Sequence, residues 1–244
     1  MTISKGHLIN TNLDESEQKI FRIMPFERFI ELMTCKKLSF VRPVLWDDPF
    51  ENFIMNSHSD CDSIKTAIYG QCWSLNIETD FMWRVYAPNK NGIKLHTNIK
   101  KFMNHIFEKN SFLENSLIFI GKVEYLPWDK TKEKFNGMSL YDSYFSRGDI
   151  KNIIANSLFI KRTEFSAESE VRVVYFYDEY LDNDIKVVDF EIEPNDFIEE
   201  VVIDSRISFD KYQILENLIR EKLGYTGVIS QSKLYSFEPL NIKE

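Results

Sequence analysis

Apolar residues recur at two different spacings along this chain, and the changes between them predict the order of strands and helices. Residues 19–23 and 38–41 have strand character, and the apolar residues of 26–33 between them recur at helical spacing. The same reasoning predicts further strands at 69–74, 92–96, 117–125, 170–177, 185–192, 198–203 and 226–239, and helices at 79–86, 99–107, 149–161 and 208–223. We therefore expect a polar N-terminal arm at 1–17 and a single α+β domain at 18–244.

The segment 42–52 interrupts this pattern with two prolines and a cluster of acidic and aromatic residues, Trp46-Asp47-Asp48-Pro49-Phe50-Glu51. It is typical of a structured loop. One interpretation is that Asp47, Asp48 and Glu51 chelate a hard cation, as in a metal-dependent nuclease. The favoured interpretation is an Asp-Pro turn whose carboxylates accept hydrogen bonds from loop amides.

Composition limits the classes of protein that remain. The 244 residues are 43% hydrophobic and 14% aromatic, which is enough for a substantial core, and the net charge of -8 argues against a broad nucleic-acid-coating surface. The most cationic segment, 122–134, alternates Lys with acidic residues and is interpreted as a solvated, mixed-charge loop. A local basic groove remains compatible with this composition.

Cysteine and histidine usage indicates neither a disulfide framework nor a zinc site. Cys35, Cys61 and Cys72 are odd in number and show no Cys-x-x-Cys spacing, and the four histidines are scattered. We see no secretory signal and no apolar run approaching the roughly 18 residues of a membrane span. We therefore expect a cytoplasmic protein without a metal or a membrane partner.

The strongest candidate for chemistry is Glu168-Ser169-Glu170-Val171-Arg172, at the start of a predicted strand. Side chains alternate along a strand, so Glu168, Glu170 and Arg172 share one face if the strand extends that far. Two carboxylates and a guanidinium at a strand entrance could form a functional site. The alternative is a surface ladder of cross-strand salt bridges, which contributes little.

Two other features have both structural and functional interpretations. Arg22 lies in an otherwise apolar strand, where it is either exposed at an edge or paired with an anion. Trp73, Met82, Trp83 and Tyr86 form an aromatic group that either packs in the core or provides a stacking wall for a flat ring.

In order along the chain, these motifs resemble a bacterial family called domain of unknown function 2971. The motifs are Phe21-Arg22-Ile23, the Pro49-Phe50-Glu51 loop, Cys72-Trp73-Ser74, Met82-Trp83-x-x-Tyr86 and Glu168-x-Glu170-x-Arg172. The family usually has Asn-Asp-Pro-Phe-Glu in the loop, and Asp47 replaces that Asn here. The resemblance covers about the first three quarters of the chain.

This family in turn looks like a distant branch of the ADP-ribosyltransferases, close to the branch of toxins that target DNA. The resemblance implies an ADP-ribosyltransferase-like split β-sheet with flanking helices. Enzymes of the diphtheria-toxin type have His on the first strand, whereas this chain has Arg22. The order Arg22, Ser74 and Glu170 matches Arg-Ser-Glu transferases instead.

The resemblance implies a role for each residue in a reaction that consumes NAD. Glu170 would hold the ribose as the nicotinamide bond breaks, Glu168 would act as base for the acceptor, and Arg22 would bind pyrophosphate or the adenosine ribose. Arg172 would orient a carboxylate. Ser74 would bind the ribose on the nicotinamide side or hold the strand end open. The remaining residues of the expected NAD site are Trp83 and Tyr86, which would stack on nicotinamide, and Trp46 and Asp48.

The expected function is transfer of ADP-ribose to a macromolecule, with nucleic acid (DNA or RNA) favoured over protein. The setting would be a bacterial toxin or an anti-phage effector, and a toxin would need an antitoxin partner. The alternative, from another class, is a non-catalytic nucleotide-binding sensor module in a defence system.

Overall fold

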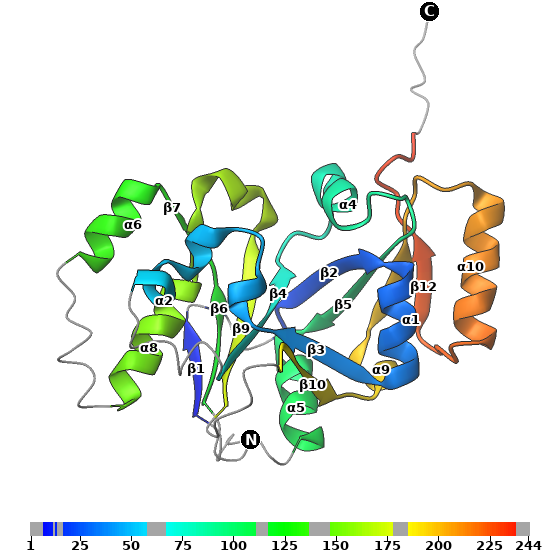
Figure 1. Ribbon diagram of the computed structural model, residues 1–244. Coiled ribbons are helices and arrows are strands. Elements are labelled where there is room, and N and C mark those ends of the chain that lie inside the picture. The colour runs from blue at the N-terminus through cyan, green and yellow to red at the C-terminus, as the bar shows by residue number, and fades with distance from the viewer. Residues whose placement is uncertain are drawn as a thin grey trace, which may run out of the picture.

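The computed structural model describes residues 7–11, 13, 17–57, 67–110, 117–136, 147–177 and 185–237 (Figure 1). The main sheet contains β1 (His7–Thr11), β2 (Lys19–Pro25), β3 (Lys37–Val41), β4 (Ile68–Ser74), β5 (Gly92–Asn98), β6 (Leu117–Lys122), β9 (Glu170–Phe176), β10 (Val187–Glu191), β11 (Glu200–Ile203) and β12 (Val228–Gln231). A separate two-stranded sheet contains β7 (Glu124–Leu126) and β8 (Ile160–Arg162).

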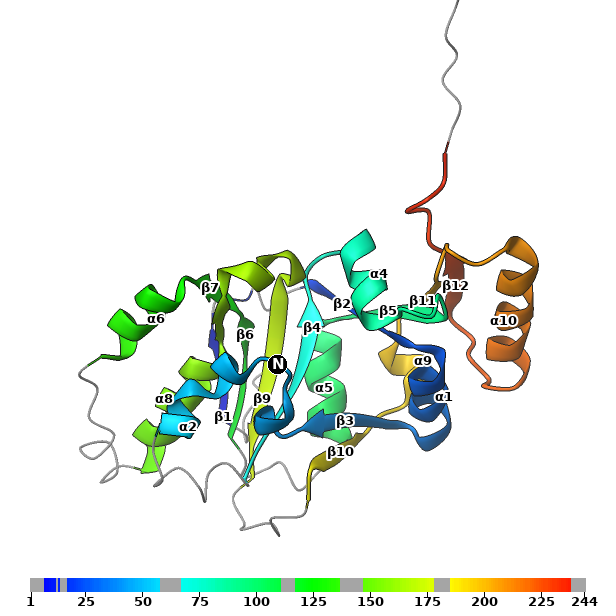
Figure 2. The same ribbon diagram turned by 45° about the horizontal axis from the view of Figure 1, so that its top comes forward.

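Helices flank this sheet on both faces (Figure 2). The α-helices are α1 (Phe26–Cys35), α2 (Phe53–Ser57), α4 (Asp80–Tyr86), α5 (Ile99–Lys109), α6 (Trp128–Phe135), α8 (Arg147–Leu158), α9 (Pro194–Phe197) and α10 (Phe209–Glu221). Three 3₁₀-helices are η1 (Pro43–Leu45), η2 (Pro49–Asn52) and η5 (Thr163–Glu168). In the described part of the chain, none of the helices has the length and apolar character needed to cross a bilayer.

The main sheet has the order β1-β6-β9-β4-β2-β5-β11-β12 and is mostly antiparallel. It is split at one position, because β2 and β4 pair only at Phe21 and Ser74. β3 touches β4 only at Val41 and Gly70 and continues to β10. This arrangement confirms the predicted α+β class with a split sheet and flanking helices.

Strand β9 is buried on both faces and separates two apolar cores. Val171, Val173 and Tyr175 face the larger core, which α1, α5, α9 and α10 complete. Val174 and Phe176 face the smaller core against α2 and α8. Because side chains alternate along a strand, Glu170 and Arg172 lie on this second face, as predicted.

Several element boundaries differ from the sequence prediction for identifiable reasons. The single strand expected at 117–125 is two strands, because the Val123 amide still donates to the Glu170 carbonyl of β9 over 2.9 Å, whereas the Glu124 amide donates to the Phe159 carbonyl over 2.8 Å. The predicted loop at 122–134 is wrong, since α6 begins after Pro127. Asp129 pairs with Lys132 and Lys130 with Glu133 at helical i,i+3 spacing.

The predicted helix at 149–161 ends earlier, at Leu158, and its last residues belong to β8. The short helix α9 was not predicted, and β1 lies inside the segment expected as an arm. The predicted helix starts after Pro25, Thr79 and Ser208 agree with the structure. Thr79 and Ser208 cap their helices through their side chains.

Candidate active site

A cavity of about 730 Å³ lies where β2 and β4 diverge. Its volume is within the range of small-molecule and cofactor sites. The residues that line it are Phe21, Arg22, Ile23, Met24, Pro25, Arg28, Glu31, Leu32, Cys35, Lys37, Leu38, Ser39, Val41, Cys72, Trp73, Ser74, Met82, Tyr86, Glu168, Glu170, Val187 and Asp189. The structure thus brings together Arg22, Ser74, Tyr86, Glu168 and Glu170 of the predicted site.

Glu168 and Glu170 reach the cavity through a sharp turn between η5 and β9. Ser169 has a φ of 44°, a left-handed conformation that ends η5 and starts the strand. The Ser74 hydroxyl donates to the Glu168 carbonyl over 2.6 Å, and the Leu75 amide donates to the Ser169 carbonyl over 2.8 Å. The end of β4 therefore fixes this turn, which supports the expectation that Ser74 acts on the strand end.

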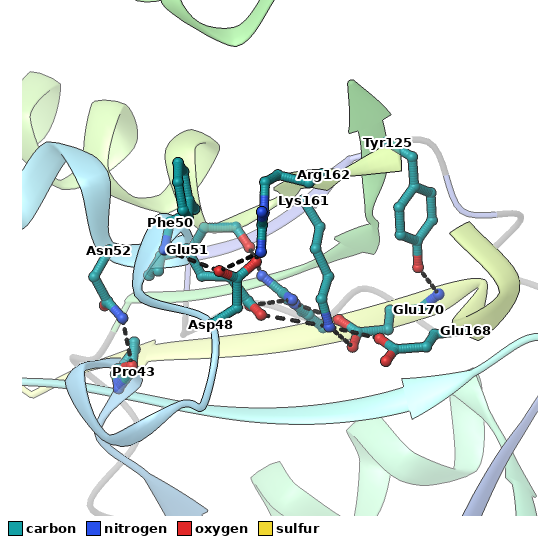
Figure 3. Close-up of polar contacts among 12 residues, drawn as sticks. Pro43, Asp48, Phe50, Glu51, Asn52, Tyr125, Lys161, Arg162, Glu168 and Glu170 are labelled. Carbon is teal, nitrogen blue, oxygen red and sulfur yellow. Dashed lines mark hydrogen bonds and ion pairs between the residues drawn. The ribbon is translucent and has the colours of Figure 1, made fainter. Parts of the chain in front are cut away.

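The two carboxylates belong to a buried charge network (Figure 3). Lys161 Nζ lies 2.5 Å from Glu168 Oε2 and 3.0 Å from Glu170 Oε1. Arg172 Nε donates to Glu170 Oε2 over 2.6 Å. Glu168 and Glu170 are each 6% exposed and Arg172 is 0% exposed, so the surface-ladder interpretation is wrong.

Arg172 belongs to the same network but is not among the residues that line the cavity. Its guanidinium forms an ion pair with Glu51 and donates through Nη1 to the Leu158 carbonyl over 2.6 Å. Its Cζ atom lies 4.6 Å from the centre of the Trp46 ring. Because these contacts use the guanidinium on several sides, Arg172 orients Glu170 and does not line the cavity, as expected.

The two carboxyl groups have different proton affinities. Burial raises the pKa of Glu168 to about 7, and the neighbouring Glu170 carboxylate adds to this effect against the opposing pull of Lys161. Burial also opposes ionisation of Glu170, but Arg172 and Lys161 together with a hydrogen bond from Glu168 hold its pKa below the usual range. The site therefore contains one ionised carboxylate and one carboxyl group that titrates near neutral pH.

At the other end of the site, Arg22 is a partly buried cation. It makes no hydrogen bond or ion pair with any residue in the described ranges, whereas the neighbouring Arg28 pairs with Glu31 over 2.7 Å. Burial and the nearby Arg28 lower the pKa of Arg22, but a guanidinium stays charged at neutral pH. A guanidinium without a partner in the described residues has donors available in the cavity, and such donors suit an anionic group.

The thiol of Cys72 also faces this cavity. Burial, with help from the Glu170 carboxylate, raises its pKa to about 12. The thiol therefore stays protonated at neutral pH and is not an activated nucleophile.

The aromatic wall of the cavity consists of Tyr86 and the thioether of Met82, both on α4. The prediction that Trp83 stacks on a ligand requires correction. Its indole is 0% exposed, packs with Ile23, Met82 and Ala87, and donates through Nε1 to Glu78 over 2.9 Å. Trp83 therefore supports the helix that carries the wall.

Trp46 and Asp48 also lie outside the cavity. Trp46 covers Arg172 and leaves little room beside Gly70, where an added Cβ would lie 2.7 Å from the indole. Asp48 accepts from the Phe50 amide and binds Arg162 through both carboxylate oxygens, at 3.1 and 3.2 Å. The Asp-Pro turn is therefore confirmed, and neither Trp46 nor Asp48 is among the residues that line the cavity.

The metal hypothesis is not supported by these contacts. Asp48 binds Arg162, and Glu51 binds Arg172 and Lys161, so cationic side chains occupy the positions where a metal would bind. Among the residues with described placement, no group of three His, Cys, Asp or Glu side chains is arranged to hold a metal ion. Cys61 and His58 lie outside the described residues.

Sequence reasoning missed Lys161 and Tyr125. The apolar spacing predicts Lys161 at the end of a helix, although Ile160-Lys161-Arg162 is a short strand. The Tyr125 hydroxyl accepts from the Glu170 amide over 2.8 Å. One signal was available in the sequence. Glu168 and Glu170 outnumber the single Arg172, and two buried carboxylates require a further cation, which indicates a second basic residue nearby.

Comparison with known proteins agrees with the resemblance inferred from the motifs. The model of the family described as "Protein of unknown function (DUF2971)" matches residues 82–173, so the predicted resemblance is confirmed over that range. No curated protein matches the sequence.

Two similar solved structures are DarT of Thermus sp. 2.9, one in complex with NAD+ and one with ADP-ribosylated ssDNA. Each is 7% identical to this chain with a TM-score of 0.41, and the alignment covers 89% of this chain. It covers 96% of the chain in the NAD+ complex and 95% of the chain in the DNA complex.

Proposed function

We propose that this protein is an NAD-dependent ADP-ribosyltransferase that modifies a macromolecule, with nucleic acid favoured over protein. One observation carries the proposal. A guanidinium that has no partner among the described residues, an aromatic wall and two buried carboxylates come from distant parts of the chain and line the same cavity. These are the groups that binding and cleavage of a pyrophosphate-linked nicotinamide nucleotide require.

Each group in the cavity has a counterpart in NAD. Arg22 is suited to the pyrophosphate, since a guanidinium binds phosphate oxygens in a bidentate manner. Tyr86 offers an aromatic surface to the nicotinamide ring. Glu170 is suited to the hydroxyl groups of the nicotinamide ribose. Ser74 holds the turn that places Glu170, and its hydroxyl could donate to the same ribose only by releasing the Glu168 carbonyl.

The carboxylates account for the chemistry of transfer. The bond between ribose C1′ and the nicotinamide nitrogen breaks, its electron pair leaves with nicotinamide, and positive charge develops on the sugar. The ionised Glu170 stabilises that charge electrostatically through the ribose. The acceptor nucleophile bonds to C1′ and its proton passes to Glu168, which is suited to this role because its pKa is about 7.

The biological setting follows from the resemblance to the DNA-targeting toxin branch. We propose that the protein acts as a bacterial toxin or anti-phage effector in the cytoplasm and that an antitoxin restrains it. The acceptor would be DNA or RNA. Because the net charge is -8, we expect the acceptor to bind near the cavity mouth and not across a broad basic surface.

The test is incubation of the protein with NAD labelled in the adenylate part, together with DNA, RNA and protein acceptors. We expect label on the acceptor and release of nicotinamide. Glu170→Gln should lower the rate by 10²–10³-fold, or about 3–4 kcal/mol in the barrier. Glu133→Gln is the matched control, since Glu133 is exposed and pairs with Lys130. Full activity of Glu170→Gln would remove this residue from the mechanism.

A second candidate is a non-catalytic nucleotide-binding sensor module. It is favoured by the observation that both Glu170 oxygens already contact cations, Arg172 Nε and Lys161 Nζ. Calorimetric titration with NAD separates the two functions. Binding without nicotinamide release, unchanged in Glu170→Gln, would establish the sensor and overturn the transferase.

A further inference from the structure

Lys161 is the one side chain within the described ranges that is in ion-pair range of three buried carboxylates. Its Nζ lies 2.5 Å from Glu168, 3.0 Å from Glu170 and 3.4 Å from Glu51. The side chain is 8% exposed and is not among the residues that line the cavity. It therefore contacts the two cavity carboxylates from behind.

The small sheet explains how Lys161 reaches this position. β7 and β8 pair in parallel, and Tyr125 lies opposite Lys161 in their register. Tyr125 binds the Glu170 backbone amide, and Lys161 binds the side chains of Glu168 and Glu170. In Figure 3, Lys161 points to these glutamates and Arg162, the next residue, points to Asp48. Both paired residues thus act on the turn that carries the carboxylates.

We propose that Lys161 is a positioning residue of the site: its ammonium group holds Glu168 and Glu170 at the cavity wall and keeps Glu168 available as a base. The catalytic part of this inference rests on the proposed transferase function. The electrostatic part does not, because it concerns the proton affinity of Glu168 in the folded protein.

Removal of the ammonium group would leave an uncompensated pair of carboxylates. Glu168 and Glu170 would repel one another, and among the described residues Arg172 would be the one cation still paired with this cluster, through Glu170 and Glu51. A carboxyl group beside a second carboxylate is more readily protonated once the cation that compensated both charges is removed. Glu168 would take up the proton, since Arg172 holds Glu170 in its ionised form. Besides Lys161, the ionisable groups around Glu168 and Glu170 are Glu51 on η2, Cys72 on β4, Tyr86 on α4, Tyr125 on β7 and Arg172 on β9.

The primary test is a ¹³C NMR titration of the glutamate carboxyl groups in the full chain, with assignments from Glu168→Gln and Glu170→Gln. In Lys161→Met we expect the Glu168 midpoint to rise by at least about one pH unit. Lys161→Arg should keep the midpoint near that of the wild type, because it retains the charge. Lys130→Met is the control, since Lys130 is exposed and pairs with Glu133 instead of with Glu168 or Glu170. An unchanged Glu168 midpoint in Lys161→Met would overturn the proposal.

A charge-balanced variant keeps the test decisive if Lys161→Met fails to fold. Glu51→Gln combined with Lys161→Met removes one carboxylate and one ammonium from the same cluster. Its Glu168 midpoint should still lie at least about one pH unit above that of Glu51→Gln alone. Equal midpoints in these two variants would show that Lys161 does not control Glu168.

Activity provides a second measurement. The acid limb of the transfer rate should move to higher pH in Lys161→Met, in step with the NMR midpoint, and Lys161→Arg should restore it. A shifted midpoint in a protein that never releases nicotinamide would overturn the proposed function and leave the role of Lys161 intact. A shifted midpoint with an unshifted acid limb would show that Lys161 does not act on catalysis.

Discussion

The two charged ends of the cavity are built in opposite ways. At the carboxylate end, Glu168 and Glu170 are held by Lys161 and Arg172, and Arg172 in turn binds Glu51. At the other end, Arg22 has no counter-ion within the described ranges. At one end each carboxylate contacts a cationic side chain of the protein, and at the other end the cation has no anionic partner among the described residues.

This difference separates groups that maintain the fold from groups that await a ligand. Removing one member of a buried ion pair leaves a buried charge uncompensated, which is strongly destabilising. Removing an unpaired, partly buried guanidinium relieves a desolvated charge instead. Stability measurements and binding measurements should therefore respond to opposite ends of the cavity.

The largest expected effect is on folding, from Arg172→Met. The substitution leaves Glu51 and Glu170 without their guanidinium, and we expect the free energy of unfolding to fall by about 3–5 kcal/mol. Urea denaturation followed by circular dichroism measures this. Arg22→Met in the same experiment should unfold at the same or a higher urea concentration. Equal losses in the two variants would break the comparison between the two ends.

The next effect is on ligand binding, from Arg22→Met. Loss of a charged hydrogen bond to pyrophosphate should weaken NAD binding by about 1.5–3 kcal/mol, or roughly 10- to 150-fold in Kd. Isothermal titration calorimetry measures it. Arg28→Met is the matched control on the same cavity, and its effect should be smaller because Arg28 is exposed and paired with Glu31. A larger loss in Arg28→Met would place the anion site at Arg28.

The pH dependence of stability should reveal the raised pKa of Glu168. Its pKa is 4.5 in the unfolded reference and about 7 when folded, so the folded state binds the proton more tightly. Its contribution to stability is therefore fully present below pH 4.5 and is lost as pH rises through about 7. The expected decline in unfolding free energy is on the order of 1–2 kcal/mol, because coupling to Glu170 distributes the titration over both groups.

Glu168→Gln should remove this decline. Glu170 has the opposite sign, since its pKa is lowered in the folded state and its contribution is lost as pH falls below 4.5. Urea denaturation at pH 4.5, 6 and 7.5 separates the two. A decline of unchanged size in Glu168→Gln would assign the titration to another group.

The smallest effect is expected at the aromatic wall. Tyr86→Leu should weaken NAD binding by about 0.5–1.5 kcal/mol, the contribution of an aromatic contact beyond its buried area. Phe81→Leu is the control on the same helix, because Phe81 is 42% exposed and does not line the cavity. The same loss in both variants would indicate a general effect on α4 and not stacking.

Much of the fold was predictable because local patterns determine it. Pro25, Thr79 and Ser208 mark helix starts through their backbone or side-chain geometry, and Gly224 follows the last helix with a φ of 68°. Local patterns failed at Lys161, where three residues of strand follow a helix without a turn signal. The pairing that makes them a strand comes from β7, 36 residues earlier in the register (Tyr125 opposite Lys161).

The candidate site was predictable at the level of which residue types converge. The positions of Arg22, Ser74, Tyr86 and Glu170 around one cavity agree with the motif order. The sequence could not show which aromatic ring is accessible. Trp83 and Tyr86 both lie on α4, and only tertiary packing directs Trp83 towards Glu78 and Tyr86 towards the cavity.

β2 and β4 pair only at Phe21 and Ser74 and then diverge. The cavity therefore arises from the course of the backbone and not from small side chains. Because the backbone creates this space, replacing a lining side chain with a smaller or larger one changes what the cavity can hold and leaves the strand divergence in place. Descendants of this chain could therefore exchange substrates by a few point changes while inheriting the architecture intact.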